Sequence, residues 1–302
     1  MSIDWIKNFK CRCSAISKMM AEKQGYEALT LKQEITVSEL EAKQASKGLT
    51  EPQQKELDRL IAKRETSKAI VLSDSCIEVL MDAYAWQTER MFSVSKETME
   101  TLSMNKGKKQ ESQAVALLNF VDDVEYKVHK DRIENEYLSG EIDIYLGGSV
   151  YNASKLTDVK NAWDYPGFLK KINNGLENGQ REQVAGYGLI TGAEDLEIAN
   201  CLVDCTEENI EEVKWKVAKK FKAVTIESPE FLKEWAKWER SMRFEHIDPF
   251  KRVHKIKIEP FTEFEREKVY EKVRICRTWL QEFHERFENK NKNVSLVQNG
   301  AL

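Results

Sequence analysis

Two aspartates and a lysine near the middle of the chain have types and spacing that suit metal-assisted or acid–base chemistry. Residues 141–146, with the sequence EIDIYL, alternate polar and apolar, which is typical of a half-buried strand and directs Asp143 away from the apolar side. Gly147 and Gly148 predict a tight turn, and the same alternation places Asp158 and Lys160 on one side of the returning strand. We therefore expect two carboxylates and one ammonium at one end of a hairpin.

Paired carboxylates suit a hard divalent cation such as Mg²⁺, which keeps several waters and takes one or two carboxylates together with substrate phosphate. A lysine beside them can orient a water while the cation stabilises charge on a phosphodiester. An acid, any residue and then lysine also occur at Glu125–Lys127 and Glu212–Lys214, so the tripeptide alone is unspecific. The partner acid on the preceding strand distinguishes Asp158 and Lys160 from these copies.

Helices are predicted on both sides of this hairpin. In the upstream helix Glu111 shares the apolar face with Val115, and a carboxylate there needs a basic partner, a backbone cap or a metal. In the downstream helix Gln183 and Tyr187 lie on one face. That glutamine suits either a hydrogen bond to a phosphate or a bound water, or a buried amide satisfied by the backbone.

Composition limits the class of protein. The 302 residues can bury one substantial core with helical additions, and 32% of them are charged. No stretch approaches the roughly 18 apolar residues of a membrane helix, and the first ten residues lack an apolar signal core, so we expect a cytoplasmic protein. The six cysteines form no CxxC pair and the four histidines no HxxxH, which argues against a zinc module; we expect mostly buried, reduced thiols.

A net charge of −4 means that any nucleic-acid surface must be a local basic patch. The candidates are three clusters: Lys106, Lys108 and Lys109; Lys214, Lys216, Lys219, Lys220 and Lys222; and Lys251, Arg252, His254, Lys255 and Lys257. Each cluster alone is equally consistent with a solvated face.

The chain divides by pattern into three parts: a helical region 1–105, a central block 106–205 that alternates helix and strand, and charged helices in 206–302. Within the first part, Gly48 breaks residues 36–64 into a helical hairpin. The central block predicts strands near 124–129 and 133–138, a loop over 161–179 and a buried strand over 198–203. A strand over 253–258 and a long helix over 263–287 follow.

Near the N-terminus, Ser14 and Ser17 are in positions to cap a helix, with Arg12 just before it. A positive side chain beside a helix start suits an anion. An ordinary cap beside a surface arginine explains the same residues.

The order of these motifs resembles the core of the PD-(D/E)XK nucleases, and more closely the phage recombination exonucleases of the lambda-exonuclease and YqaJ-like group. The resembling segments are KGKKQES, YLSGEIDI, LTDVKNAWD and REQVAGYGLITG, all between residues 106 and 192, although the likeness covers most of the chain. It implies an α/β (α+β) fold with a mixed central sheet flanked by helices, a restriction-endonuclease-like core with helical N- and C-terminal additions.

The resemblance also implies roles for individual residues. Asp143, Asp158 and the carbonyl of Val159 would bind Mg²⁺ or Mn²⁺, Lys160 would position water, Glu111 would complete the acidic cluster, and Gln183 would support it. The residues that would contact DNA or its terminal 5′ phosphate are Arg12, Ser14, Lys106, Lys108, Lys109 and Tyr187. Three positions depart from the family pattern: Ile142 replaces the usual proline, Asp158 the commoner glutamate, and Ala185 a second glutamine.

The function implied is a 5′-to-3′ exonuclease that resects linear double-stranded DNA for recombination, with a possible homotrimer and a single-strand annealing protein as partner. Two other interpretations stay open. One is an endonuclease or repair nuclease of the same fold, and the other is a DNA-binding or scaffold protein that has kept the fold without hydrolysis.

Overall fold

The computed structural model describes residues 4–22, 29–68, 72–92, 110–223 and 225–299. The chain forms two compact units, one of residues 1–95 with 261–302 and one of residues 96–260. The predicted boundaries near 105 and 205 stay predictions. Lys106, Lys108 and Lys109 lie outside the described residues.

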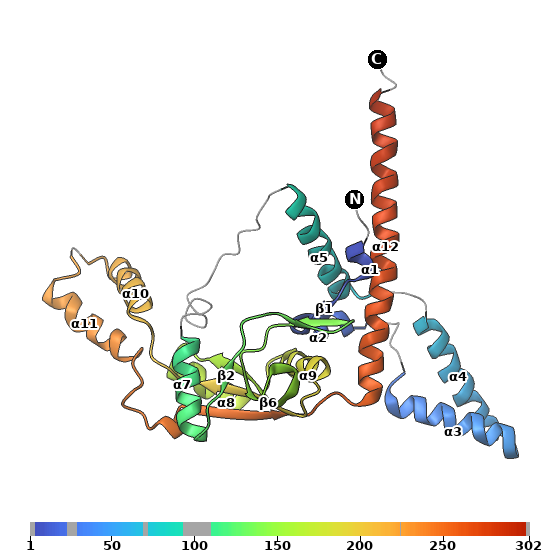
Figure 1. The fold of residues 1–302 in the computed structure, drawn as a ribbon, viewed down its shortest axis with the longest axis horizontal. Coiled ribbons are helices and arrows are strands. Elements are labelled where there is room, and N and C mark those ends of the chain that lie inside the picture. Colours follow the sequence, from blue (N-terminus) through green and yellow to red (C-terminus); the bar gives the residue numbers. More distant parts are fainter. Residues whose placement is uncertain (1–3, 23–28, 69–71, 93–109, 224, 300–302) are drawn as a thin grey trace. The chain divides into compact units, whose positions relative to one another are not determined.

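The second unit is built on a mixed sheet flanked by helices (Figure 1). Its elements in chain order are α7 (Glu111–Asp122), β2 (Lys127–Val128), β3 (Ile133–Glu134), β4 (Leu138–Gly140), β5 (Ile144–Gly147), the 3₁₀ turn η2 (Val150–Asn152), β6 (Ala153–Asn161), α8 (Tyr165–Asn174), α9 (Gln180–Thr191), β7 (Asp195–Cys201), α10 (Glu207–Lys220), α11 (Pro229–Arg240), η3 (Pro249–Lys251) and β8 (Val253–Ile258). Five strands form a sheet in the order β2-β5-β6-β7-β8, in which β6 and β7 are parallel and the other neighbours antiparallel. A separate antiparallel pair joins β3 to β4.

The predicted hairpin is the junction between β5 and β6. Ile144 pairs with Thr157, and the ladder ends there on the side of Asp143. Gly147 has a φ of 130°, and a Cβ at this position would come within 2.7 Å of the carbonyl oxygen of Asn152. Glycine is therefore required where the chain turns back.

The two faces of the sheet carry different helices. The apolar side of α7 packs with Ile144, Ala199 and Cys201, so α7 covers one face. Asp158 and Asn200 alternate with residues of that face and point to the other, where α9 contacts β6 and β7. The predicted burial of the β7 strand on both sides is confirmed.

The predicted loop over residues 161–179 is wrong, because it contains α8 (Figure 1). Asp164 caps this helix by accepting a hydrogen bond from the backbone of Gly167 at 2.7 Å, and Pro166 occupies the first turn. The predicted strands over 124–129 and 133–138 are shorter in the structure. The chain leaves α7 through Asp123, whose φ is 52°, and reaches an extended ladder only at β2.

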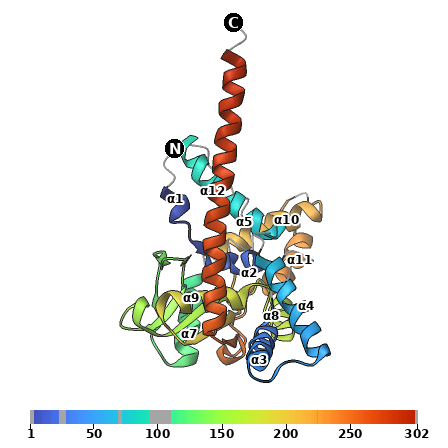
Figure 2. The ribbon, with the colours of Figure 1, turned by 90° about the vertical axis from the view of Figure 1, so that its right-hand side faces the viewer.

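The regular structure among the described residues of the first unit is helical, together with one strand of two residues. Its elements are α1 (Asp4–Lys7), β1 (Cys11–Arg12), η1 (Cys13–Ala15), α2 (Ile16–Met20), α3 (Leu31–Lys47), α4 (Glu51–Lys68), α5 (Asp74–Phe92) and α12 (Glu263–Asn299). The predicted helical hairpin is confirmed as α3 and α4, which lie side by side (Figures 1 and 2). Thr30 and Gln33 form a capping box at its start, and Gly48, with a φ of 75°, ends α3.

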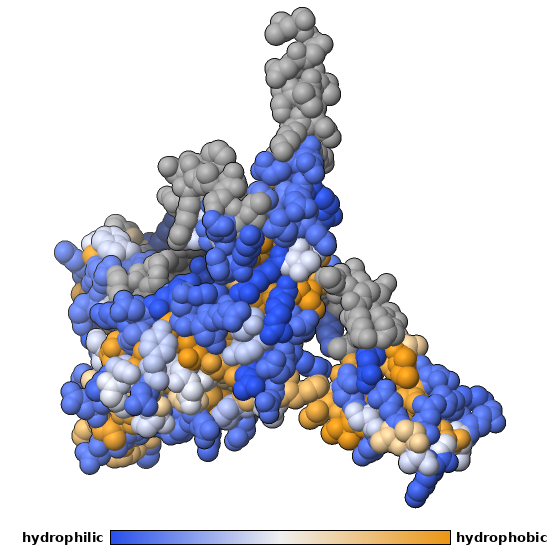
Figure 3. Space-filling view, turned by 45° about the vertical axis from the view of Figure 1, so that its right-hand side comes forward, coloured by the Kyte–Doolittle hydropathy of each residue, from blue (hydrophilic) through white to orange (hydrophobic). Residues whose placement is uncertain are grey.

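Figure 3 shows that hydrophilic residues cover most of the face in view, with apolar residues in separate patches. Among the described helices, none combines the length and the apolar character that crossing a membrane requires. All six cysteines are buried free thiols, as predicted.

Candidate active site

The hairpin brings the two predicted aspartates together. Asp143 lies directly before β5, and one of its carboxylate oxygens, Oδ2, accepts a hydrogen bond from the backbone of Val159 at 2.7 Å. Asp158 lies within β6 and is only 3% exposed. Because Ile144 pairs with Thr157, the next positions along the two strands place these carboxylates across from each other.

Lys160 completes this group. Its ammonium nitrogen lies 2.8 Å from Oδ2 of Asp158, and its side chain is 30% exposed. Burial opposes the charge of this ammonium, but Asp158 and, beyond it, Asp143 stabilise the charge, so the pKa of Lys160 lies above its ordinary value. The lysine is therefore protonated at neutral pH and still partly accessible to solvent, as a hydrogen-bond donor to a water or a phosphate must be.

Asp143 occupies an environment that disfavours its charge. Burial, followed by the neighbouring charge of Asp158, raises the pKa of Asp143 to about 7, although the Val159 hydrogen bond and Lys160 act in the opposite direction. Glu111, the first residue of α7, also raises it, so this third acid lies within electrostatic range. A cation beside Asp143 would relieve this repulsion.

Helix α9 contributes a short chain of hydrogen bonds next to Asp158. The amide nitrogen of Gln183 donates to Oδ1 of Asp158 at 3.4 Å and to the hydroxyl of Tyr187 at 2.7 Å. Tyr187 is buried, at 4% exposure. The structure therefore places Tyr187 behind Gln183, where it orients the amide.

The carboxylates of Asp143 and Asp158 are oxygen ligands that suit a hard cation, but they do not surround a complete coordination site. Within the described ranges, no group of three or more His, Cys, Asp or Glu side chains is arranged to hold a metal ion, and Glu111 joins the two aspartates only at longer range. Oδ2 of Asp158 is buried, and apart from its ion pair with Lys160 it accepts no hydrogen bond from a described residue. Two carboxylates with open positions match Mg²⁺, which retains much of its water.

The backbone adds one further oxygen. Within a strand the N–H and C=O of one residue point the same way, so the carbonyl of Val159 points, like its N–H, past the end of the β5–β6 ladder toward Asp143. The ligand role that the resemblance implied for this carbonyl stays a prediction.

The residues expected to hold DNA are only partly placed. Arg12 and Ser14 belong to the first unit, where Ser14 lies in η1, and α2 begins after Ala15 without a side-chain cap. The expectation that Ser14 or Ser17 caps a helix is therefore wrong, because Ser14 lies inside the 3₁₀ turn and Ser17 inside α2, whose N-cap residue is Ala15.

One charged residue near the site was missed. Glu177, after α8, contributes to the raised pKa of Lys160. Its carboxylate also forms an ion pair with Lys171, whose ammonium nitrogen lies 2.6 Å from Oε1 of Glu177. It falls in the segment predicted as a loop, where no periodicity drew attention to it.

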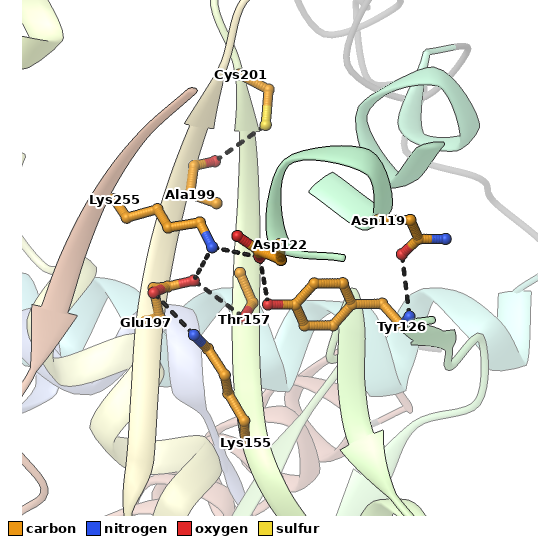
Figure 4. Close-up of polar contacts among 9 residues, drawn as sticks. All are labelled: Asn119, Asp122, Tyr126, Lys155, Thr157, Glu197, Ala199, Cys201 and Lys255. Atoms are coloured by element: carbon orange, nitrogen blue, oxygen red, sulfur yellow. Dashed lines mark hydrogen bonds and ion pairs between the residues drawn. The ribbon is translucent and has the colours of Figure 1, made fainter. Parts of the chain in front are cut away.

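The face of the sheet beneath α7 holds a different polar group (Figure 4). Glu197 pairs with Lys155 at 2.9 Å and with Lys255 at 3.5 Å, and Lys255 also pairs with Asp122, which accepts from the hydroxyl of Tyr126 at 2.8 Å. Lys255 is thus committed to an internal ion pair, which removes it from the basic cluster predicted over 251–257.

The fold of this chain is similar to the folds of two exonucleases of known structure. A phage-related exonuclease from Haemophilus somnus 129PT matches with a TM-score of 0.57 and 15% identity over 95% of this chain and 100% of that chain. An alkaline exonuclease from Laribacter hongkongensis, also solved with dAMP, matches with a TM-score of 0.47 and 10% identity over 97% of this chain and 100% of that chain. No family model and no curated protein matches. The first likeness shows that this chain has the fold of a phage-related exonuclease, which confirms the predicted mixed α/β fold.

Proposed function

We propose that this protein is a metal-dependent deoxyribonuclease that hydrolyses phosphodiester bonds. The observation that carries the proposal is the group of Asp143, Asp158 and Lys160 at the open end of the β5–β6 hairpin, with the ammonium 2.8 Å from Asp158. It stands in a chain with the fold of a phage-related exonuclease. Fold alone does not fix chemistry, so the proposal rests on this group.

A bound divalent cation supplies positive charge that stabilises a phosphodiester in the transition state. Asp143, Asp158 and the carbonyl of Val159 would hold it, and Gln183 keeps Asp158 oriented. Lys160 donates a hydrogen bond that orients the attacking water. The water oxygen forms the new bond to phosphorus, the bond to the 3′ oxygen breaks, and one proton of the water ends on that oxygen, so the products are a 5′ phosphate and a 3′ hydroxyl.

The finer proposal is an exonuclease that degrades one strand of linear duplex DNA from its 5′ end and leaves a 3′ single strand. The resemblance to the phage recombination exonucleases supports it. In this proposal Arg12 and Ser14 contact the terminal 5′ phosphate, and Lys106, Lys108 and Lys109 contact the duplex. Glu111 completes the acidic cluster, and Tyr187 acts through Gln183.

The same resemblance supports a phage protein acting in the bacterial cytoplasm as a ring of three copies, with a single-strand annealing protein as its partner. Light scattering coupled to size-exclusion chromatography would measure the mass. The proposal predicts about three times the monomer mass of 35.1 kDa. A strictly monomeric protein that still resects DNA would contradict the ring.

The central experiment digests blunt linear duplex, labelled at either the 5′ or the 3′ end, with and without Mg²⁺. We expect nucleotide release only with the cation, with early release of the 5′ label. Lys160→Ala should reduce the rate at least 10²-fold, because it removes the donor to the water. Lys237→Ala is the matched control, since Lys237 is an exposed lysine whose ammonium pairs with Glu234 at 2.9 Å.

Nicked and closed circular DNA separate the alternatives. Efficient cutting of a closed circle would favour the endonuclease. Early release of the 3′ label would reverse the polarity. A protein that binds duplex but releases no nucleotide with Mg²⁺ or Mn²⁺ would favour the non-catalytic DNA-binding protein and end the nuclease proposal.

A further inference from the structure

Asn200 is a polar residue in the middle of an apolar strand. It lies in β7, between Ile198 and Leu202, which point to the same face of the sheet and are fully buried. Asn200 itself is only 3% exposed. Its backbone is satisfied by the ladders to β6 and β8, so the question is what its side chain does.

The amide of Asn200 has no hydrogen-bond partner among the described residues. An apolar residue would fit the pattern of the strand better, because Ile198 and Leu202 on the same face are both buried. The fold itself therefore provides no reason for an asparagine here.

The register between strands β6 and β7 provides a reason for an asparagine at this position. Asn200 is the direct partner of Lys160 in the parallel β6–β7 ladder, so both side chains leave the same face of the sheet, with their strands about 5 Å apart. That face is opposite to the one drawn in Figure 4, where Ala199 and Cys201 lie. The amide thus lies beside the aliphatic stem of Lys160, whose ammonium turns to Asp158.

We propose that Asn200 is a positioning residue for Lys160. Its amide oxygen offers the ammonium a second acceptor, directly or through one water, and this keeps the ammonium at the end of the strand where the attacking water must lie. A lysine has a flexible four-carbon stem and three donors, so a single ion pair leaves it free to rotate. The inference rests on the proposed hydrolysis, because it assigns Asn200 a role in that reaction.

The first test needs neither metal nor DNA. In ¹⁵N-labelled, metal-free protein, the side-chain amide signals of Asn200 are identified by their loss in Asn200→Leu. Lys160→Met keeps the stem and removes the ammonium, and we expect it to shift these signals. Lys237→Met should not. Unchanged Asn200 signals in Lys160→Met would overturn the inference.

The second test separates positioning from structure. Asn200→Leu removes the amide and keeps the branching, so we expect an equal or higher Tm together with a 10- to 100-fold lower kcat and a nearly unchanged KM. Asn200→Asp keeps an acceptor oxygen and should recover part of the loss. A merely structural residue would instead lose Tm and activity together.

Asn209 provides the matched control. It is a fully buried asparagine of α10, and neither its amide oxygen nor its amide nitrogen has a hydrogen-bond partner in the described chain. Asn209→Leu should leave kcat unchanged. A wild-type kcat in Asn200→Leu would overturn the inference alone, whereas a wild-type protein without Mg²⁺-dependent hydrolysis would end the proposed function and this role with it.

Discussion

At the scale of single residues, the site keeps a carboxylate where its charge is unfavourable. Asp143 is partly buried beside Asp158 and has its pKa raised to about 7, well above the ordinary value near 3.9. Such groups are retained at functional sites at the expense of stability. The metal-free protein should therefore gain stability when the charge is removed.

Asp143→Asn tests this in a chelating buffer. Between pH 4 and pH 7 the unfolded chain releases the Asp143 proton while the folded chain retains it, so folding becomes less favourable as pH rises through this window. The amide oxygen can still accept from Val159. We expect the variant to gain about 1–4 kcal/mol at pH 8 and clearly less at pH 5 in urea unfolding. A gain that does not grow with pH would contradict the charge as its cause.

The sequence allowed the main residues of this site to be predicted, because alternation in a strand fixes which side chains share a face. Asp158 and Lys160 are two positions apart, and the Gly147 turn determines their partner. Asn200 could not be found this way. Its significance depends on the register between β6 and β7, which joins residues 40 positions apart and has no local sequence signal.

At the scale of elements, the three strands β6, β7 and β8 are joined beneath α7 by the ion pairs around Glu197 (Figure 4). Glu197 is 9% exposed and neutralises two lysines that leave the sheet on the same face. Removing one partner of a buried ionic group leaves the others without compensation. The cost should exceed that of an exposed pair of the same length.

Glu197→Ala should therefore destabilise the protein by about 3–5 kcal/mol. Glu212→Ala is the control, because Glu212 and Lys216 are also 2.9 Å apart but largely exposed on α10, and its cost should stay below about 0.5 kcal/mol. Chemical denaturation of both variants in the same buffer measures the difference. Equal losses would show that burial does not strengthen the Glu197 group.

Elements were predicted well where periodicity or capping was strong and poorly where composition misled. The α3–α4 hairpin followed from Gly48 and from charged helical stretches. The missed α8 contains glycine and a run of asparagines, which suggested a loop, but Asp164 and Pro166 carry the start signal of a helix. The helix also buries Phe168 in a cluster with Leu202 and Phe244. This contact joins distant parts of the sequence, so no local pattern predicted it.

At the scale of the whole molecule, the chain holds its six thiols in its interior. Buried thiols react slowly because the thiolate must form and be reached, and burial raises the pKa of Cys13 and Cys201 to about 12. Sequence spacing predicted reduced cysteines but not their positions. No local pattern in the sequence predicted that residues 261–302 join residues 1–95 in one unit.

Ellman's reagent should therefore modify the native protein slowly and all six thiols rapidly in guanidinium. Far-ultraviolet circular dichroism before and after treatment would show whether modification requires unfolding. Rapid modification of one thiol in the native state would indicate local opening near that cysteine. Reductant should leave the Tm unchanged, because no described cysteine is in a disulfide.

One consequence concerns the length of α7. Its first residue, Glu111, acts electrostatically on Asp143, and its last, Asp122, is fixed to Lys255 and Tyr126. Inserting one residue rotates one end of a helix by about 100° relative to the other. After such an insertion, Glu111 and Asp122 cannot both keep their positions, so the length of α7 determines how the two acids are placed. Related proteins should therefore tolerate substitutions within this helix far more readily than insertions or deletions.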